Sequence, residues 1–269
     1  MAKRKSLTFI AFFLILGFLA LFAIPFIISL LWPQPSNTNK SLRAMIIDTV
    51  CISEPNDELI KNITEALKSR GFKVDIYLAQ NVTVSLMRRL TNNYKLIILR
   101  VHSSYTHFPR TFLPNNTVVI ITGERYANYK YLKEQVLELL VASTVVPELG
   151  LAYGYFAITP RFVSSLNGSF GGAMIIAMGC NTLYTTSMAK AFIDKGAKVY
   201  IGWDNYVSAK HMDRALGLLI KLLLIDKMTV KDAIDKVNKE VGPDPVYKAK
   251  LVYYPLYSGS INIDQIIKP

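Results

Sequence analysis

The sequence predicts a three-layer α/β/α domain with a mostly parallel sheet, preceded by one N-terminal transmembrane helix. Three observations lead to this prediction. Short apolar, strand-like runs alternate with amphipathic segments from residue 42 onward, which is typical of parallel sheets with crossover helices. Two of these runs end directly before His102 and Cys180. An uncharged, mostly apolar run of 26 residues, 7–32, follows the basic residues Lys3, Arg4 and Lys5.

The N-terminal run is too long for a cleaved signal peptide. As a helix it would extend for roughly 39 Å, more than a bilayer core requires. A signal peptide would have an apolar core of roughly 7–15 residues and a small-x-small cleavage site. This run instead ends in Trp32-Pro33. The basic residues before the run place the N-terminus in the cytoplasm.

We therefore expect a single-pass protein of the cell membrane. Residues 1–33 would form a cytoplasmic stub and a signal-anchor, in which residues 7–32 contact the lipid bilayer. Residues 34–41, which are polar and contain Pro, Asn and Ser, would form a linker. Residues 42–269 would form one extracytoplasmic domain.

The amino-acid composition of the chain indicates which kinds of molecule it could bind. The chain carries 31 Lys and Arg against 19 Asp and Glu, a net charge of +12. Lys3, Arg4 and Lys5 supply three of these charges, and the remaining +9 is spread along the chain without a basic block. Nucleic-acid binding is not expected, because it would require clustered basic residues with interleaved aromatics. Five Asn-x-Ser/Thr sequons fit a glycosylated exterior domain. They begin at Asn39, Asn62, Asn81, Asn115 and Asn167.

The first half of the domain has the expected alternation. Residues 42–48, 72–78 and 94–101 are predicted strands, and residues 56–70 and 83–92 are predicted helices. Gly71 ends the first helix as a C-cap residue. Parallel strands with two crossover helices follow from this order.

The middle of the chain is less regular. A short strand at 118–121 is expected to form a hairpin with residues 103–108. Residues 129–142 have helical periodicity, and residues 147–156 are irregular. Thr159 and Pro160 predict an N-cap and the first position of a short helix.

The last third returns to the α/β pattern. We expect strands at 173–179 and 197–202, and helices at 182–195, 207–226 and 229–241, the last with Thr229 as its N-cap. The tail to Pro269 should be extended over the domain.

Polar and aromatic residues follow several of these strands. They are Asp48, His102, Cys180, Trp203 and Asp204. Ligands bind at the carboxyl ends of strands in open parallel sheets, so this edge is the expected site.

Thiolate nucleophilic catalysis requires at least a thiol and a neighbouring imidazole, which Cys180 and His102 would supply. Cys180 precedes a predicted helix start, and a helix N-terminus lowers the pKa of a thiol. Its backbone N–H is a candidate oxyanion donor. The structural alternatives are an inert buried cysteine and a hydrogen-bonded histidine at a strand end. His107 and His211 are poorer candidates, and the three histidines form no metal motif.

The remaining edge residues have two interpretations each. Asp204 could hold a basic substrate side chain or cap the next helix. Asp48 could orient a neighbouring group or be an ordinary strand-end residue. With Trp203, these residues form the candidate substrate pocket.

Cys51 and Cys180 could form a disulfide outside the cell. If the strands before them lie two places apart, the separation is about 9.6 Å, whereas a disulfide needs Cα atoms within about 7 Å. We expect free thiols.

The order strand–His, strand–Cys, then the segment AKAFIDKGAKVYIGW at 189–203 resembles the caspase–hemoglobinase fold of clan CD cysteine peptidases, and gingipain-like domains most. The similarity covers residues 42–241. In that group the histidine ends the third strand and the cysteine ends the fourth. The resemblance implies a caspase-like fold, a His102/Cys180 dyad and an oxyanion hole from the amides of Ser103 and Cys180. The family usually has Gly directly after the histidine, whereas Ser103 occupies this position and restricts the backbone more.

The sequence therefore predicts a membrane-anchored extracytoplasmic cysteine endopeptidase that acts on peptides or proteins without cofactor or metal. The alternative is a catalytically inactive caspase-like binding or receptor domain. A flavodoxin-like ligand-binding module is a third possibility, but neither G-x-G-x-x-G nor a P-loop occurs.

Overall fold

The structure is a computed structural model that describes residues 42–106, 111–143 and 154–268. All of these residues belong to one compact unit. The predicted anchor and linker, Asn39 and His107 lie outside the described residues. Within them, no helix is both long and apolar enough to cross a membrane.

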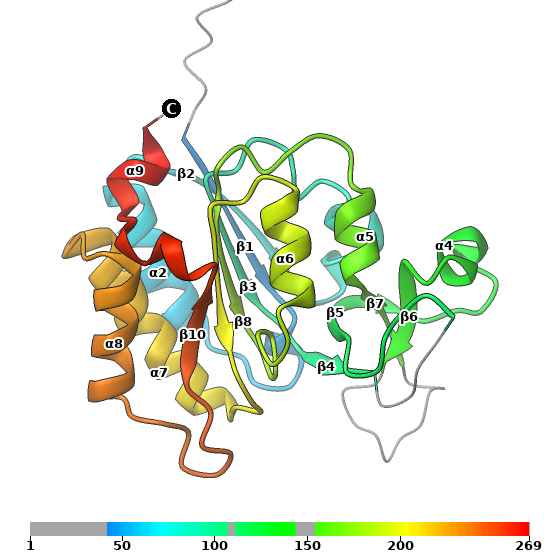
Figure 1. Cartoon of the computed structure of the whole chain (residues 1–269). Coiled ribbons are helices and arrows are strands. Elements are labelled where there is room, and N and C mark those ends of the chain that lie inside the picture. The colour runs from blue at the N-terminus through cyan, green and yellow to red at the C-terminus, as the bar shows by residue number, and fades with distance from the viewer. Residues whose placement is uncertain (1–41, 107–110, 144–153, 269) are drawn as a thin grey trace, which may run out of the picture. The chain divides into compact units, whose positions relative to one another are not determined.

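A six-stranded sheet forms the centre of the domain (Figure 1). Its strands are β1 (Arg43–Asp48), β2 (Lys73–Leu78), β3 (Leu96–Arg100), β8 (Met174–Met178), β9 (Val199–Trp203) and β10 (Leu251–Tyr254). The spatial order is β10-β9-β8-β3-β1-β2. Only β10 is antiparallel to its neighbour. The sheet is therefore mostly parallel, as predicted.

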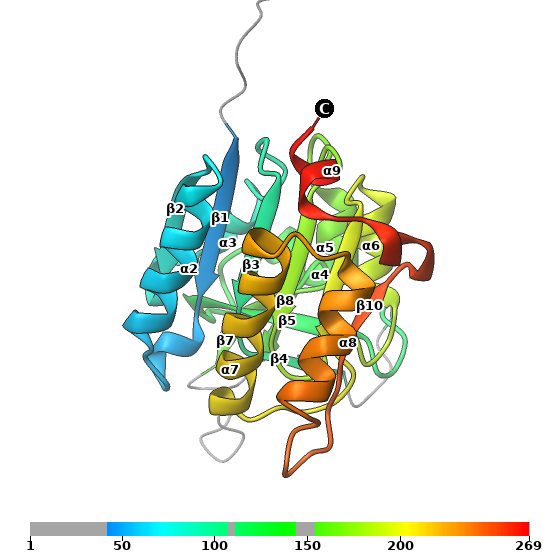
Figure 2. The ribbon, with the colours of Figure 1, turned by 90° about the vertical axis from the view of Figure 1, so that its left-hand side faces the viewer.

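Helices cover both faces of this sheet and complete the three predicted layers. One face carries α2 (Asp57–Ser69), α7 (Ala209–Ile220), α8 (Val230–Glu240) and α9 (Ile263–Ile267), which Figure 2 shows in front of the strands. The other face carries α3 (Val84–Met87), α5 (Pro160–Ser165) and α6 (Ser187–Asp194).

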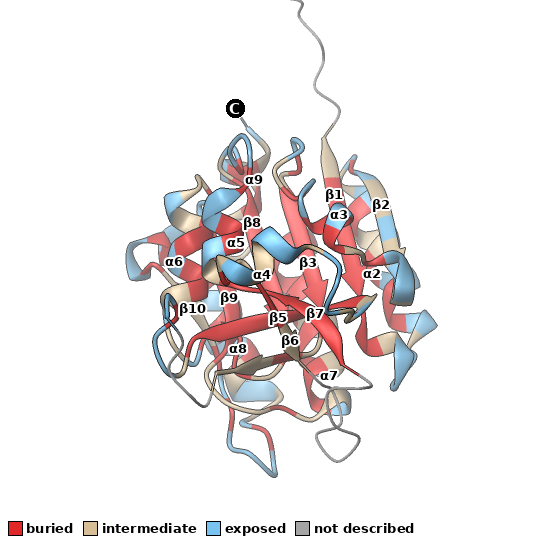
Figure 3. Cartoon of the chain, turned by 90° about the vertical axis from the view of Figure 1, so that its right-hand side faces the viewer, coloured by how far each residue is buried: buried red, intermediate tan, exposed pale blue. Residues whose placement is uncertain are grey.

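The alternation of side chains along the strands creates two cores. On β1, Ala44 and Ile46 pack toward α2 and α7, whereas Met45 and Ile47 pack toward the α3, α5 and α6 side. Strands covered on both faces become continuous apolar runs, which is why these segments were recognisable in the sequence. Figure 3 shows the central strands β3 and β8 buried along their whole length, whereas the edge strand β2 is half-buried or exposed.

A second, antiparallel sheet lies beside the first (Figure 1). It contains β4 (Ser103–Tyr105), β5 (Val118–Arg125), β6 (Leu140–Ser143) and β7 (Tyr155–Ile158) in the order β4-β5-β7-β6. The predicted pairing of residues 103–108 with the strand at 118–121 is confirmed by β4 and β5.

The helix predicted over 129–142 is only partly correct. It is reduced to α4 (Leu132–Val136), after which the chain enters β6. Leu140 and Val141 are buried in pairing with β7, so tertiary packing overrides the local helical periodicity.

N-caps were predicted well. Thr159 and Thr229 accept hydrogen bonds from the backbone N–H of Phe162 and Asp232. The helix predicted over 83–92 is shorter than expected, because α3 ends at Met87. The long helix predicted over 207–226 is confirmed, since α7 continues as a π-helix over Lys221–Ile225. The tail is not simply extended, because it forms β10, the 3₁₀ segment Leu256–Ser260 and α9.

The helix predicted to start at residue 182 begins instead at Ser187. Thr182 is tied to the sheet: its hydroxyl donates to the Ala177 carbonyl at 2.8 Å and accepts from the Trp203 N–H at 3.0 Å. The Leu183 N–H donates to the Trp203 carbonyl at 2.8 Å. These bonds hold the segment after Cys180 along the end of β9 and delay the helix.

Candidate active site

Strand register brings His102 and Cys180 to neighbouring positions. β3 and β8 pair in parallel with Arg100 opposite Met178, and the Val101 N–H donates to the Met178 carbonyl at 2.8 Å. His102 and Cys180 each lie two residues beyond this matched pair. Because side chains alternate, both should lean toward the face covered by α2 and α7. Cys180 does pack against the core on that face.

Gly179 permits this close approach of the two strand ends. A Cβ atom at this position would lie 2.3 Å from the Val101 carbonyl oxygen and 2.6 Å from the Ser103 hydroxyl. The Ser103 hydroxyl donates to the Cys180 carbonyl. The backbone around the cysteine is therefore locked to the residues that flank His102.

Neither predicted oxyanion donor has a backbone acceptor across β5 or in the other described backbone hydrogen bonds. The Ile121 N–H donates to the His102 carbonyl at 2.9 Å, with Ser103 opposite Ile120 in the same ladder. Bonded pairs alternate along an antiparallel ladder, so the Ser103 N–H points away from β5. The Cys180 N–H donates to no acceptor within residues 42–106, 111–143 and 154–268.

His102 is held from the side of β1. Its Nε2 lies 3.1 Å from the Ser53 hydroxyl, which follows the 3₁₀ turn Val50–Ile52. That hydroxyl also contacts the Val50 carbonyl at 3.3 Å, a group that can only accept. We assign the serine proton to the Val50 carbonyl, so that Nε2–H of His102 donates to Ser53. This tautomer leaves Nδ1 as the basic nitrogen.

Both members of the candidate dyad are neutral at pH 7. Burial, assisted by the nearby charge of Arg100, lowers the pKa of His102 to about 4. Burial raises the pKa of the Cys180 thiol, while its backbone contact with Val207 acts in the opposite direction. The Cys180 sulfur lies 3.5 Å from the Val207 carbonyl oxygen. The predicted lowering of the thiol pKa by a helix N-terminus is therefore wrong, since α6 starts seven residues later at Ser187.

A buried ion-pair network lies directly behind His102. The Arg100 guanidinium binds Asp48 at 2.9 Å and Asp213 at 2.7 Å, and its side chain is fully buried. It also donates to the Glu54 carbonyl at 2.8 Å, which ties the loop containing Ser53 to β3. Asn56 donates to the second oxygen of Asp213 at 2.8 Å. Such a satisfied network fixes geometry, and removing one partner leaves a charge buried alone.

The expected substrate pocket does not form from Asp48 and Trp203. Asp48 is 1% exposed and is bound to Arg100. Trp203 is also 1% exposed, and its indole N–H donates to the Met178 sulfur at 3.3 Å. The burial of both side chains argues against direct substrate contact.

Asp204 anchors the edge strand, which is a third role that the sequence did not indicate. Its carboxylate accepts from the Lys250 N–H at 2.7 Å, next to the start of β10. It is half-buried, and it does not cap α7, whose N-cap residue is Ser208.

The cysteines are free thiols, as expected. The Cys51 thiol donates to the Asp48 carbonyl at 3.1 Å. His211 is buried, with Nε2 3.0 Å from the Gly242 carbonyl, which is a structural environment. No group of His, Cys, Asp and Glu within the described ranges could hold a metal ion.

The described sequon asparagines are exposed. They are Asn62, Asn81, Asn115 and Asn167. Their exposure is compatible with glycosylation.

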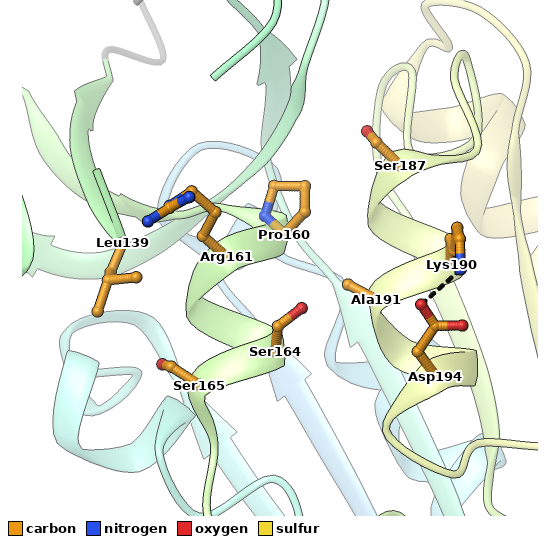
Figure 4. A pocket seen from close by; sticks show the side chains of 9 residues that line it. All are labelled: Leu139, Pro160, Arg161, Ser164, Ser165, Ser187, Lys190, Ala191 and Asp194. Carbon is orange, nitrogen blue, oxygen red and sulfur yellow. Dashed lines mark hydrogen bonds and ion pairs between the residues drawn. The ribbon is translucent and has the colours of Figure 1, made fainter. Parts of the chain in front are cut away.

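Two hollows on the surface lie apart from the dyad. One of 620 Å³ lies between α5 and α6, on the sheet face opposite α7, where Lys190 pairs with Asp194 (Figure 4). The other, of 430 Å³, lies between α2 and α7 and includes Asn62 and Arg214. Neither is lined by His102 or Cys180.

Sequence reasoning missed Ser53, Arg100 and Asp213. A signal was present for Arg100, which is a charge inside an apolar strand directly before His102. A buried arginine requires anionic partners. Nothing in the sequence indicated that Asp213, more than a hundred residues later, would be one of them.

A scan against protein-family models gives no match for this chain, and a search of curated proteins gives none either.

Proposed function

We propose that this chain is a membrane-anchored, extracytoplasmic cysteine endopeptidase of the caspase-like clan CD type, with Cys180 as nucleophile and His102 as base. The observation that carries the proposal is the matched register of β3 and β8. It places the imidazole and the thiol two residues beyond the same rung of the sheet. In chain order β3 is the third and β8 the fourth strand of the central sheet, as in the family that the sequence resembles.

The proposed reaction begins from two neutral groups. As the Cys180 sulfur attacks a peptide carbonyl carbon, its proton passes to Nδ1 of His102. The carbonyl oxygen becomes an oxyanion, which the amides of Ser103 and Cys180 stabilise. The imidazolium then protonates the leaving amine, and the C–N bond breaks to leave a thioester.

Water completes the cycle. Neutral His102 removes a proton from the attacking water, a second oxyanion forms in the same place, and the thioester C–S bond breaks. The imidazolium returns its proton to the sulfur. No cofactor enters this scheme, and the raised thiol pKa means that deprotonation is coupled to attack.

The test is hydrolysis of a peptide library by the full-length chain. Cys180→Ala and His102→Ala should each abolish turnover, and Cys180→Ala should also abolish labelling of this residue by iodoacetamide. Cys51→Ala is the matched control, because it removes the other thiol and should leave turnover intact. Undiminished hydrolysis by Cys180→Ala would refute the proposal.

A second function is a non-catalytic binding or receptor domain with the same fold. The burial that raises the thiol pKa and the Ser103 departure favour it. It predicts no turnover on any peptide, together with an unchanged cellular phenotype for the His102/Cys180 double variant.

A further inference from the structure

Four tyrosine rings form a continuous row beside Cys180. In order they are Tyr184, Tyr105, Tyr206 and Tyr247, here called the tyrosine row. Successive ring centroids lie 5.2, 6.2 and 5.8 Å apart, and the first pair is stacked. These spacings are those of interacting aromatic pairs.

Short backbone links connect the row to the candidate nucleophile. Tyr206 directly precedes Val207, whose carbonyl oxygen lies 3.5 Å from the Cys180 sulfur. The Asn181 N–H donates to the Asn205 carbonyl at 2.9 Å, and the Tyr184 N–H donates to the Asn181 carbonyl at 2.9 Å. The Asn205 amide donates to the Tyr247 carbonyl at 2.9 Å. The segment of Tyr105 is tied to the same place by the Ser103 hydroxyl, which donates to the Cys180 carbonyl. All four tyrosine-bearing segments therefore converge on the carboxyl edge of the sheet.

The row is open to solvent at both ends. Tyr184 is 48% and Tyr247 is 45% exposed, while the two inner rings are half-buried. Aromatic rings contributed by four separate segments and left uncovered beside a nucleophile suit the capture of a flat apolar group.

Asn181 adds an unsatisfied polar group to the same place. Its side chain is 1% exposed, and neither Oδ1 nor Nδ2 has a hydrogen-bond partner in the described part of the chain. Burial raises the pKa of Tyr206, and hydrogen bonding by the Asn181 side chain lowers it, so Tyr206 is a polar neighbour of that amide, although the two do not form a hydrogen bond of good geometry. A buried amide without a well-formed hydrogen bond is unfavourable, and a ligand that supplies a partner relieves this cost. Its one acceptor and two donors complement the N–H and C=O of a peptide unit.

The charged groups near the tyrosine row indicate whether it would bind an aromatic or a basic side chain of a substrate. Tyrosine faces attract cations as well as rings, so a basic substrate is the main competitor. The buried carboxylate of Asp244, which acts on the Cys180 thiol, is already saturated. It accepts from the Ser208 hydroxyl and from the N–H groups of Ser208, Val246 and Tyr247, at 2.7–2.9 Å. Its acceptor sites are occupied, so a substrate cation would not form a direct ion pair with it.

We propose that the tyrosine row is the subsite for an aromatic side chain next to the scissile bond of an extended peptide, with Asn181 pairing to the peptide main chain. This inference rests on the proposed peptidase function and names its substrate class. Because the Asn181 amide is buried, a neighbouring side chain has to move for the peptide main chain to reach it.

The experiment compares peptides that differ only beside the scissile bond, with Phe, Leu, Lys or Glu at that position. The full-length chain should cleave the Phe peptide with a kcat/KM about tenfold or more above the Leu peptide. Tyr206→Leu should remove this preference and Tyr206→Phe should keep it. Tyr257→Leu is the matched control, since Tyr257 is 79% exposed and lies in the 3₁₀ segment after β10. Asn181→Ala should lower kcat/KM on all four peptides alike.

Binding of the same peptides to Cys180→Ala, measured by calorimetry, separates the two proposals. Tighter binding of the Phe peptide than of the other three supports the subsite even if no peptide is cleaved, in which case only the catalytic proposal fails. A preference for Lys or Glu, or none, in both binding and cleavage overturns the subsite. If cleavage nevertheless depends on Cys180, the peptidase proposal stands.

Discussion

The Ser53 hydroxyl lies 3.1 Å from Nε2 of His102 and links the loop after β1 to the strand end that carries the candidate base. The contact fixes both the orientation and the tautomer of the imidazole. Arg100 supports it from behind by binding the Glu54 carbonyl, one residue beyond Ser53. The serine is a positioning residue, because it acts on the base and not on the reacting atoms.

Ser53→Ala should therefore lower kcat without abolishing turnover. The imidazole would lose its acceptor at Nε2 and rotate more freely, so we expect a loss of about tenfold in kcat with little change in KM. Ser53→Thr keeps a hydroxyl and should restore most of the activity. An unchanged kcat for Ser53→Ala, measured by steady-state kinetics, would show that the contact does not position the base.

The Arg100 network should dominate the stability of the sheet edge. Replacing Asp213 with Ala leaves the buried arginine paired with Asp48 but takes the acceptor away from its Nε–H, which should cost about 1–3 kcal/mol. Lys190→Ala provides the comparison, because its pair with Asp194 is 60% and 58% exposed and solvent screening leaves it little effect on stability. Urea unfolding of both variants measures the difference. Equal, small losses for the two would contradict a structural role for the network.

Gly179 and Gly217 should respond to alanine in opposite directions. At Gly179 a Cβ atom would lie 2.3 Å from the Val101 carbonyl oxygen, so the strand ends must move apart. We expect Gly179→Ala to destabilise the protein by more than about 2 kcal/mol and to remove activity. At Gly217, inside α7, the nearest atom is 3.6 Å away, and alanine should stabilise the helix by about 0.5–1 kcal/mol. Thermal unfolding of the two variants tests both signs.

An element of the fold could be predicted from the sequence when the residues that determine it lie close together in the chain. The apolar runs of β1, β3, β8 and β9 are buried on both faces, so each is visible within five or six residues of sequence. Caps such as Thr229 are equally local. The helix expected at 182 failed because a side-chain bond to β9, twenty-one residues later, holds Thr182 in place.

The residues of the candidate site also fall into those that local sequence could identify and those that it could not. His102 and Cys180 were predictable because each ends a recognisable strand, and parallel strands end at a common edge. Trp203 and Asp48 were given a substrate role on the same reasoning, but both are buried. Their partners, Met178 and Arg100, lie on other strands, so only the assembled sheet identifies them as structural residues.

The depressed pKa of His102 makes stability depend on pH in a defined window. The folded protein holds the imidazole neutral down to about pH 4, whereas the unfolded chain protonates it near 6.5. The unfolded state therefore binds more protons between these values, and stability falls as the pH is lowered through this window. Above pH 6.5 the contribution is constant. The expected loss by pH 4 is on the order of 1–3 kcal/mol. In His102→Gln, which cannot titrate, the fall in unfolding free energy between pH 6.5 and pH 4 should be smaller by this amount.

The same pKa predicts how activity depends on pH. Because His102 is neutral at pH 5–7, kcat/KM should not fall at the ordinary pKa of histidine but only toward pH 4. A descending limb centred near pH 6.5 would show that the imidazole is exposed and that the buried, neutral dyad is not the working state.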